Sequence, residues 1–297
     1  MTPPLRGLLC PVTTPFDPGG DASPDRLAAQ IEIYQRLGVH GAVVFGTSGE
    51  GPLIDADEEA RLLAAARSAL ASDRAFVVQV GHESLRATLA SARRAETAGA
   101  DALLCLPPRY YPLGAAGIAR FYRAVAGACG LPLLAYHIPQ LTHVDPGSEI
   151  LCELASDGTL VGIKDSAGDI ALQRALRKAG GDGFAIFNGS ARLTLESLRQ
   201  GADGAILAVS DAVPERVLAI LDAHAAGDGD SAEVAQRAIG PLADCVGARY
   251  GVPGIKAALD LRGWPGGGAP RAPLAALGRT ERDEIRAALL VAGVDLS

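Results

Sequence analysis

The stretch from Leu160 to Asp169 has the sequence LVGIKDSAGD, an apolar run that ends in Lys164 and opens into a loop of small and acidic residues. The apolar run predicts a buried strand, and such surroundings penalise the charged ammonium form of a lysine at its end. A neutral amine is a nucleophile suited to forming a Schiff base with a ketone or aldehyde, which then serves as an electron sink for a neighbouring carbon–carbon bond. The alternative for this stretch alone is a lysine that caps the strand end and pairs with Asp165 or Asp169.

Apolar runs of the same kind alternate with helix-like stretches along most of the chain. Continuous apolar strands between helices predict a parallel sheet buried on both faces, and eight such units fit a closed (β/α)8 TIM barrel. The open alternative, a doubly wound dinucleotide-binding fold, lacks its GxGxxG fingerprint after the first strand. The predicted strands are 7–10, 42–45, 75–80, 102–106, 133–136, 160–164, 184–187 and 205–208. The predicted helices are roughly 24–37, 56–71, 84–98, 115–128, 146–156, 169–178, 190–200 and 214–226.

The pattern becomes purely helical beyond residue 226. We therefore expect residues 1–226 to form the catalytic barrel and residues 227–297 to form a C-terminal helical extension packed on it. A chain of 297 residues with 48% hydrophobic content is long enough, since such a barrel uses about 250 residues. The helical stretches of the extension are 231–250, 254–261 and 280–292.

Charge and composition narrow the expected partners. A formal net charge of −7 and a pI near 5.3 argue against nucleic acid or an anionic membrane as the main partner, but leave room for a small anionic substrate. Five cysteines without a CxxC pair and five histidines without ligand spacing predict neither a disulfide framework nor a metal site. The first residues lack a basic region followed by a long apolar stretch, so we expect a cytoplasmic protein with no membrane span.

Three motifs follow predicted strands, at the face of a barrel where loops carry the chemistry. Residues 46–51, GTSGEG, predict a nest of backbone amides and hydroxyls for an anion; the alternative is an ordinary glycine-rich turn. Tyr136 ends the fifth strand and is either a proton relay or a core aromatic. Residues 107–112, PPRYYP, predict either a wall of the site or a subunit contact.

Together these segments resemble the dihydrodipicolinate synthase / N-acetylneuraminate lyase family of Schiff-base aldolases, and the resemblance extends over nearly the whole chain. The spacings match as well, with 88 residues from Ser48 to Tyr136 and 28 from Tyr136 to Lys164. The matching motifs are PVTTPF at 11–16, GTSGE at 46–50, PPxY at 107–110, YxxP at 136–139, GIKDSxGD at 162–169 and GIKAAL at 254–259.

The resemblance implies roles for the matching residues. Lys164 would form the Schiff base with the keto carbon of pyruvate or another 2-oxo acid, and Tyr136 would act as general acid and base. Thr47 and Ser48 would bind the 2-oxo acid carboxylate, with Ser48 also linking Tyr136 to Tyr110. Tyr110 would reach into the site of a neighbouring subunit, which implies a homotetramer built as a dimer of dimers.

The resemblance also implies that Gly189, Ile206 and Ser166 line the substrate pocket near Lys164. Leu141 stands where members that make dihydrodipicolinate have an arginine for the carboxylate of aspartate semialdehyde. An apolar side chain cannot replace a bidentate guanidinium, so the resemblance is closer to the aldolases acting on 4-hydroxy-2-oxoglutarate or 2-keto-3-deoxy sugar acids.

Two further positions depart from the family pattern. Arg192 follows Gly189 where sialic acid-cleaving members usually have acidic residues, and we expect it either to recognise an anionic or hydroxylated tail or to face solvent. His137 replaces the commoner asparagine beside Tyr136, and strand alternation predicts that it turns away into a structural role.

We therefore expect a class I aldolase, a lyase that reversibly cleaves a 2-oxo-4-hydroxy acid into an aldehyde and pyruvate or a related 2-oxo acid. No cofactor or metal is expected, because the protonated imine stabilises the carbanion as an enamine. Two alternatives stay open. One is a dihydrodipicolinate synthase-like synthase or a 2-keto-3-deoxy sugar acid dehydratase, which would share the core residues. The other is a barrel that binds a 2-oxo acid as a sensor without turning it over.

Overall fold

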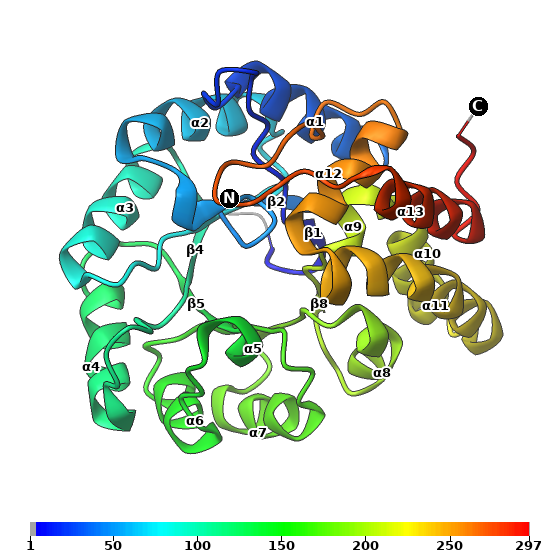
Figure 1. Ribbon diagram of the computed structural model, residues 1–297. Helices are drawn as coiled ribbons and strands as arrows, with labels where there is room; N and C mark the ends of the chain where they lie inside the picture. Colours follow the sequence, from blue (N-terminus) through cyan, green and yellow to red (C-terminus); the bar gives the residue numbers. More distant parts are fainter. Residues whose placement is uncertain (1–3, 297) are drawn as a thin grey trace.

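Eight parallel strands close into one barrel, with each strand paired to its neighbours in sequence order (Figure 1). The strands are β1 (Gly7–Cys10), β2 (Gly41–Val44), β3 (Ala75–Gln79), β4 (Ala102–Cys105), β5 (Leu133–His137), β6 (Gly162–Asp165), β7 (Ala185–Asn188) and β8 (Gly204–Ala205). The computed structural model describes residues 4–296. The barrel closes where Gly7 and Leu8 of β1 pair with Gly204 and Ala205 of β8. Closure leaves no strand edge open, and the TIM-barrel prediction is confirmed.

Helices surround the barrel, and most of them connect one strand to the next (Figure 1). They are α1 (Pro24–Arg36), α2 (Ala56–Ala69), α3 (Leu85–Thr97), α4 (Gly114–Ala126), α5 (Pro139–Thr142), α6 (Ser148–Ser156), α7 (Ile170–Gly180), α8 (Thr194–Arg199), α9 (Val209–Ala212) and α10 (Pro214–Ala225). Short 3-10 turns, η1 (Gly51–Leu53) and η2 (Ala191–Leu193), precede α2 and α8. Side-chain caps fix some starts: Asp169 accepts a 3.0 Å hydrogen bond from the Leu172 amide as α7 begins.

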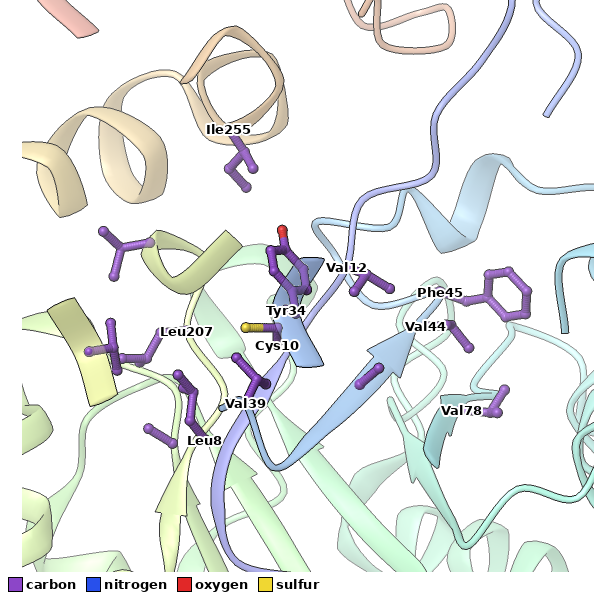
Figure 2. Packing of buried hydrophobic residues seen from close by; sticks show 14 of the residues in the cluster. Leu8, Cys10, Val12, Tyr34, Val39, Val44, Phe45, Val78, Leu207 and Ile255 are labelled. Atoms are coloured by element: carbon purple, nitrogen blue, oxygen red, sulfur yellow. The ribbon is translucent and has the colours of Figure 1, made fainter. Parts of the chain in front are cut away.

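Two apolar layers follow from the alternation of side chains along the strands. Leu9 and Tyr136 belong to a buried cluster inside the barrel. Their strand neighbours Leu8 and Cys10 instead belong to the layer between strands and helices, together with Tyr34 of α1 (Figure 2). The same alternation points Tyr136 and the next residue of β5, His137, to opposite faces.

Most observed boundaries lie within one or two residues of the predicted ones, and three differences are described here. β6 begins at Gly162 and runs to Asp165, two residues later than predicted at its start. β8 has only two residues, and the chain then turns into α9, which the sequence did not predict. The predicted helix 231–250 divides into α11 (Gly229–Ala243) and a π-helical turn η3 (Asp244–Arg249); Pro241 lies near this change and lacks the amide that a regular helix needs.

The C-terminal part of the chain packs against the barrel and its helices. It consists of α11, η3, α12 (Gly251–Leu261) and α13 (Arg279–Val291), and α12 lies next to α9 (Figure 1). The segment 262–278 lies against α1 and α2, because Arg26 donates to the Pro265 and Gly267 carbonyls and Arg271 pairs with Glu58. The division of the chain at residue 226 stays a prediction. Of the helices between residues 4 and 296, none has the length and apolar character that crossing a membrane requires.

A buried ion pair connects this C-terminal part to the loop after β2. Lys256 Nζ of α12 lies 2.5 Å from Glu50 Oε1, and both side chains are shielded from solvent. The other Glu50 oxygen, Oε2, accepts a 2.7 Å hydrogen bond from the Arg271 amide. Burial lowers the pKa of Lys256 from its usual value, and the Glu50 carboxylate opposes that shift. Removing one partner would leave the other charge buried alone.

We expect Lys256→Met to lower the free energy of unfolding by about 3–5 kcal/mol, because it leaves the Glu50 carboxylate unpaired in an apolar interior. Urea unfolding measures the loss. The double variant Glu50→Gln/Lys256→Met removes both charges and should be more stable than the single variant. A loss below about 1 kcal/mol in Lys256→Met would show that the ion pair contributes no more to stability than an exposed one.

Candidate active site

Lys164 and Tyr136 meet inside the barrel at the ends of two neighbouring strands. They are opposite each other in the register of β5 and β6, and both side chains are buried. Lys164 Nζ donates a 3.0 Å hydrogen bond to Tyr136 Oη and lies 4.1 Å from the centre of the tyrosine ring. The amine is therefore held beside a phenol that can accept or return a proton.

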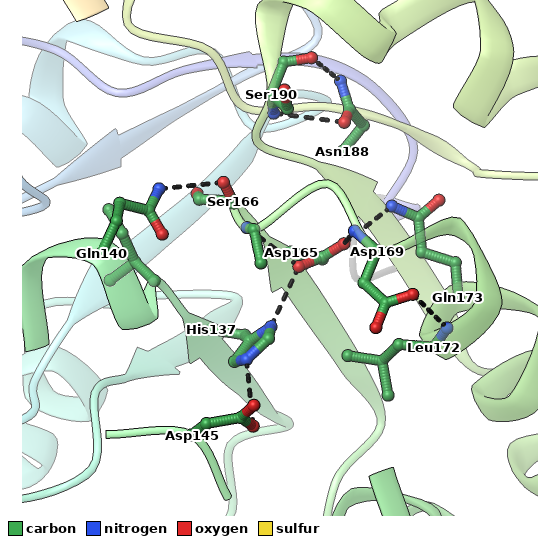
Figure 3. Close-up of polar contacts among 12 residues, drawn as sticks. His137, Gln140, Asp145, Asp165, Ser166, Asp169, Leu172, Gln173, Asn188 and Ser190 are labelled. Carbon is green, nitrogen blue, oxygen red and sulfur yellow. Dashed lines mark hydrogen bonds and ion pairs between the residues drawn. The ribbon is translucent and has the colours of Figure 1, made fainter. Parts of the chain in front are cut away.

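The two aspartates that follow Lys164 have other partners, so the pairing of Lys164 with Asp165 or Asp169 that the alternative expected is not found. Asp165 accepts hydrogen bonds from the amides of Ala167 and Asp169 and from the side chains of His137 and Gln173 (Figure 3). Asp169 caps α7. Within residues 4–296, no carboxylate lies at ion-pair distance from Lys164 Nζ.

The loop after β2 brings hydroxyls and amides to the same place. Thr47 Oγ1 lies 2.9 Å from Tyr136 Oη, which makes a chain of three polar groups from Lys164 to Thr47. The Glu50 and Gly51 amides donate to carbonyls within the loop. The amides of Thr47 and Ser48 have no hydrogen-bond acceptor in the described part of the chain, which leaves them available to an anion.

Backbone constraints explain the composition of this loop. Phe45 and Glu50 both have left-handed φ angles, 60° and 54°, which are unusual for residues other than glycine. A Cβ on Gly51 would lie 1.9 Å from the Phe45 carbonyl oxygen, and one on Gly49 would lie 2.9 Å from the Phe45 amide nitrogen. The two glycines therefore permit a tight loop that the Glu50 ion pair with Lys256 holds in place.

The residues expected to line the pocket come from the ends of β6, β7 and β8. The Gly189 amide donates to the Asp165 carbonyl, and a Cβ at Gly189 would lie 2.2 Å from Ser166 Oγ, so these two segments touch. Ile206 is fully buried in the interior cluster that contains Tyr136. The Ser166 carbonyl accepts a 2.9 Å hydrogen bond from Gln140, which ties the β5 loop to this rim (Figure 3).

Tyr110 lies apart from the groups around Lys164. Its side chain is 78% exposed and packs edge to face against Tyr111, which is 71% exposed. The backbone here is fixed, because the amides of Arg109 and Tyr110 both donate to Glu83 Oε2 at 2.9 Å. Within the described residues, no hydrogen bond joins Tyr110 to Ser48 or Tyr136.

Leu141 and Arg192 both lie outside the polar core of the site. Leu141 is 55% exposed on α5. Arg192 is 72% exposed at its side chain and pairs with Asp244 at 2.6 Å, so its guanidinium is directed to η3. Of the two expectations for Arg192, a place on the outer surface fits the structure.

His137 faces outward from the barrel, between two carboxylates. Nδ1 lies 3.0 Å from Asp165 Oδ1, and Nε2 lies 3.5 Å from Asp145 Oδ1 (Figure 3). Burial lowers the pKa of His137, but Asp165 and Asp145 together outweigh it and raise the pKa above its usual value. His137 thus supports Asp165 and the β6 loop from behind, away from Tyr136.

Sequence analysis assigned no role to two buried charged side chains near the site. Lys256 lies in the quoted GIKAAL motif, but nothing local indicates that it reaches Glu50. Asp211 lies in the apolar stretch after β8, and its carboxyl is fully buried. Acidic residues are rarely fully buried, so an aspartate within an apolar stretch could have identified Asp211 as an unusual position from the sequence.

A second concave region lies away from Lys164. A cleft of about 350 Å³ lies at the opposite end of the barrel, where strands begin, with Arg6, Val161 and Asp203 in its lining. Residues 4–296 contain no group of three or more His, Cys, Asp or Glu side chains placed to hold a metal ion. The arrangement around Lys164 combines an amine, a phenol, a hydroxyl and free amides, which suits imine formation with a carbonyl compound that also carries a carboxylate.

Comparison with known proteins gives a consistent picture. The model of the dihydrodipicolinate synthetase family matches residues 4–292. A protein named "Uncharacterized DapA-like lyase" from Halobacterium salinarum is 32% identical over 290 residues, with 98% of this chain and 95% of the relative covered. A 4-hydroxy-tetrahydrodipicolinate synthase of Streptomyces coelicolor is 35% identical over 298 residues, with 99% and 95% covered. The chloride-inhibited dihydrodipicolinate synthase of Acinetobacter baumannii, solved with pyruvate, superposes with a TM-score of 0.91 at 26% identity and covers 98% of this chain and 100% of that one.

We expect His137→Asn to destabilise the protein more at low pH than at high pH. The pKa of His137 is raised in the folded state, so its contribution to stability is complete below the unfolded pKa of about 6.5 and is lost as the pH rises through the folded pKa. Urea unfolding of both proteins at about pH 5.5 and about pH 8.5 measures the difference. A gap between the two proteins that stays the same or widens with pH would show that His137 is not held as a cation.

Proposed function

The chain belongs to the dihydrodipicolinate synthetase family, and on that premise we propose that it is a lysine Schiff-base aldolase that reversibly cleaves a 2-oxo-4-hydroxy acid. Membership makes it a lyase, and the relative from Halobacterium salinarum bears that name. The observation that carries the proposal is the 3.0 Å contact between the buried Lys164 amine and the Tyr136 hydroxyl, in a site without a carboxylate partner for the lysine.

In the proposed reaction, Lys164 Nζ attacks the keto carbon at position 2 of the substrate. Tyr136 supplies the proton with which the carbonyl oxygen leaves as water, so that an iminium forms. Tyr136 then takes the proton of the 4-hydroxyl as the bond between carbons 3 and 4 breaks. The bonding electrons move into the iminium to give an enamine, and the aldehyde is released. Protonation of the enamine at carbon 3 and hydrolysis return pyruvate and free Lys164.

The loop after β2 is proposed to hold the carboxylate of the substrate. Thr47 and Ser48 supply hydroxyls and unbonded amides, and Thr47 is already 2.9 Å from Tyr136. A carboxylate anchored here would place the adjacent keto carbon near the Lys164 amine, which is the orientation that imine formation requires. In this proposal Ser48 also passes protons between Tyr136 and Tyr110 of a neighbouring subunit.

The residues at the rim of the site are the basis for the proposed substrate class. We propose that Gly189, Ile206 and Ser166 line the pocket for the part of the substrate beyond carbon 3, of the 4-hydroxy-2-oxoglutarate or 2-keto-3-deoxy sugar acid type. Leu141 offers no charge to a second carboxylate, which disfavours aspartate semialdehyde as the partner. The named synthase among the relatives makes that reaction the competing possibility.

We further propose that the enzyme is a cytoplasmic homotetramer, a dimer of dimers. The exposed Tyr110 and Tyr111 form a rigid aromatic pair of the kind enriched at subunit interfaces. The cysteines of the described chain are free, which suits a reducing compartment.

Incubation with pyruvate and a borohydride should add the mass of one reduced pyruvyl group to Lys164. The matched variants separate two roles: Lys164→Ala should lose the label, whereas Tyr136→Phe should keep it while turnover falls by about 10²–10⁴-fold, because the amine remains and the acid is removed. Peptide mass spectrometry locates the label. Labelling that survives Lys164→Ala would contradict the proposal. Near-normal turnover of Tyr136→Phe would show that Tyr136 is a core aromatic with no part in proton transfer.

A panel of 2-oxo-4-hydroxy acids, with pyruvate release coupled to a reporter enzyme, should show efficient cleavage of at least one member. Condensation of pyruvate with aspartate semialdehyde should be slow by comparison, with kcat/KM reduced by the equivalent of roughly 1.5–3 kcal/mol for the missing charge-assisted hydrogen bond. If aspartate semialdehyde is instead the best partner, the chain is a synthase. Pyruvate that is trapped on Lys164 without turnover of any substrate would indicate a sensor.

Mixing Lys164→Ala and Tyr110→Phe proteins under subunit exchange should raise activity above the sum of the parents. Mixed interfaces would contain sites with an intact lysine and a neighbour's intact tyrosine. Size-exclusion chromatography and native mass spectrometry verify that exchange has occurred. Exchange without any gain would place Tyr110 outside the neighbour's site.

A further inference from the structure

Asp165, the last residue of β6, is completely buried behind Lys164. The two neighbours point to opposite faces of the strand: Lys164 contacts Tyr136 inside the barrel, whereas the Asp165 carboxylate reaches Gln173 of α7 outside it. Among residues 4–296, its only ion-pair partner is His137, and neither a lysine nor an arginine lies at ion-pair distance. Hydrogen bonds therefore have to compensate for the burial of this carboxylate.

The Asp165 carboxylate accepts four hydrogen bonds, which uses the full capacity of its two oxygens (Figure 3). Oδ1 accepts from the Ala167 amide at 3.1 Å and from His137 Nδ1 at 3.0 Å. Oδ2 accepts from the Asp169 amide and from Gln173 Nε2, both at 2.9 Å. The two amides wrap the loop 165–169 around the carboxylate, and the two side chains connect it to β5 and α7.

Both side-chain donors are held by further partners. Gln173 Oε1 accepts a 2.6 Å hydrogen bond from Ser197 Oγ of α8, so that Gln173 Nε2 is left to face Asp165. On the other side, His137 Nε2 lies 3.5 Å from Asp145 Oδ1. Because the donors are oriented from behind, they cannot readily turn to compensate for a lost acceptor at position 165.

The backbone around Asp165 continues directly into the site. The Asp165 carbonyl accepts a 2.7 Å hydrogen bond from the Gly189 amide, and the Ser166 amide donates to the His137 carbonyl at 2.8 Å. Since β6 has only four residues, Lys164 lies one position from the end of a short strand, where fraying begins. The place of the Lys164 amine, 3.0 Å from Tyr136 Oη, thus depends on what holds this end.

We propose that Asp165 is a positioning residue for Lys164: by accepting four hydrogen bonds, it fixes the end of β6 and holds Lys164 Nζ against Tyr136 Oη. The inference rests on the proposed function, in which Asp165 touches neither the substrate nor the transferred proton. The carboxylate of the substrate is proposed to bind the loop after β2, which Asp165 does not contact. Loss of the anchor should therefore slow imine formation at Lys164 much more than it weakens the binding of pyruvate.

The anchoring is tested on the free protein with Asp165→Asn, which keeps the size of the side chain but replaces one oxygen by an NH2 group. In either orientation of that group, the backbone amide of Ala167 or of Asp169 faces another donor. Hydrogen exchange at one of these two amides should be faster by about 10-fold or more, while the amides of β3 keep their rates. Unchanged exchange at both amides, or an equal acceleration in β3, would overturn the proposal without reference to any substrate.

The effect on Lys164 is measured by stopping the reaction with pyruvate at timed intervals with a borohydride. In Asp165→Asn, the maximal rate constant for labelling of Lys164 should fall by about 10- to 100-fold, because the amine is displaced from its reactive position. The pyruvate concentration that gives half of this rate should change by less than about 3-fold, because the carboxylate site is intact. A carboxyl group that only stabilised the fold would lower the labelled fraction and leave the rate constant unchanged.

Two further variants complete the design. Gln173→Leu removes one of the four donors from the side of β6 that faces away from Lys164, and its maximal rate constant should fall by roughly 2- to 5-fold. It keeps the test open if Asp165→Asn fails to fold. Asp169→Asn is the matched control, because Asp169 lies in the same loop and its carboxylate caps α7, a task that asparagine also performs. Its labelling kinetics should match those of the wild type.

The outcomes separate the two proposals. A wild-type rate constant in folded Asp165→Asn or in Gln173→Leu, or a comparable fall in Asp169→Asn, would overturn the role of Asp165 while leaving the aldolase proposal intact. Wild-type protein that pyruvate does not label at Lys164 would overturn the aldolase proposal and, with it, the role of Asp165 in placing the amine.

Discussion

The buried ion pair between Glu50 and Lys256 is the interaction on which the site depends. Glu50 has a left-handed backbone conformation and ends the loop that carries Thr47 and Ser48. Such a conformation persists only where the surroundings impose it, and here Lys256 and the Arg271 amide hold both oxygens of the carboxylate. The orientation of Thr47 toward Tyr136 is thus maintained by a side chain and a backbone amide from the far end of the sequence.

Closure of the barrel brings the other groups of the site together. Parallel strands all end at one face, so Lys164 meets Tyr136, and Ile206 joins the interior cluster that contains Tyr136. The alternation of side chains along β5 directs two adjacent residues to opposite faces of the strand. Tyr136 contacts the amine inside, while His137 packs outside between two carboxylates and supports Asp165 at the base of the next loop.

Local sequence pattern predicted the features that depend on nearby residues. The strand and helix alternation predicted the barrel, and strand period placed Tyr136 and His137 on opposite faces. Features that depend on distant residues were missed. β8 is shorter than predicted because its apolar run turns into α9, which packs against α10 and α12. The contact of Lys256 with Glu50 and the bare carboxyl of Asp211 exist only once the barrel has closed.

The hydrogen bond from the Arg271 amide to Glu50 spans 221 positions of the chain. During synthesis from the N-terminus, residues 46–51 leave the ribosome long before the partners that fix their shape. The strands can begin to pair earlier, but the loop after β2 acquires its final geometry only when α12 and the segment after it have emerged and docked. Catalytic competence is therefore among the last properties that the nascent chain gains. A prematurely terminated chain could form the barrel, but its loop at residues 46–51 would lack the contacts that fix its shape.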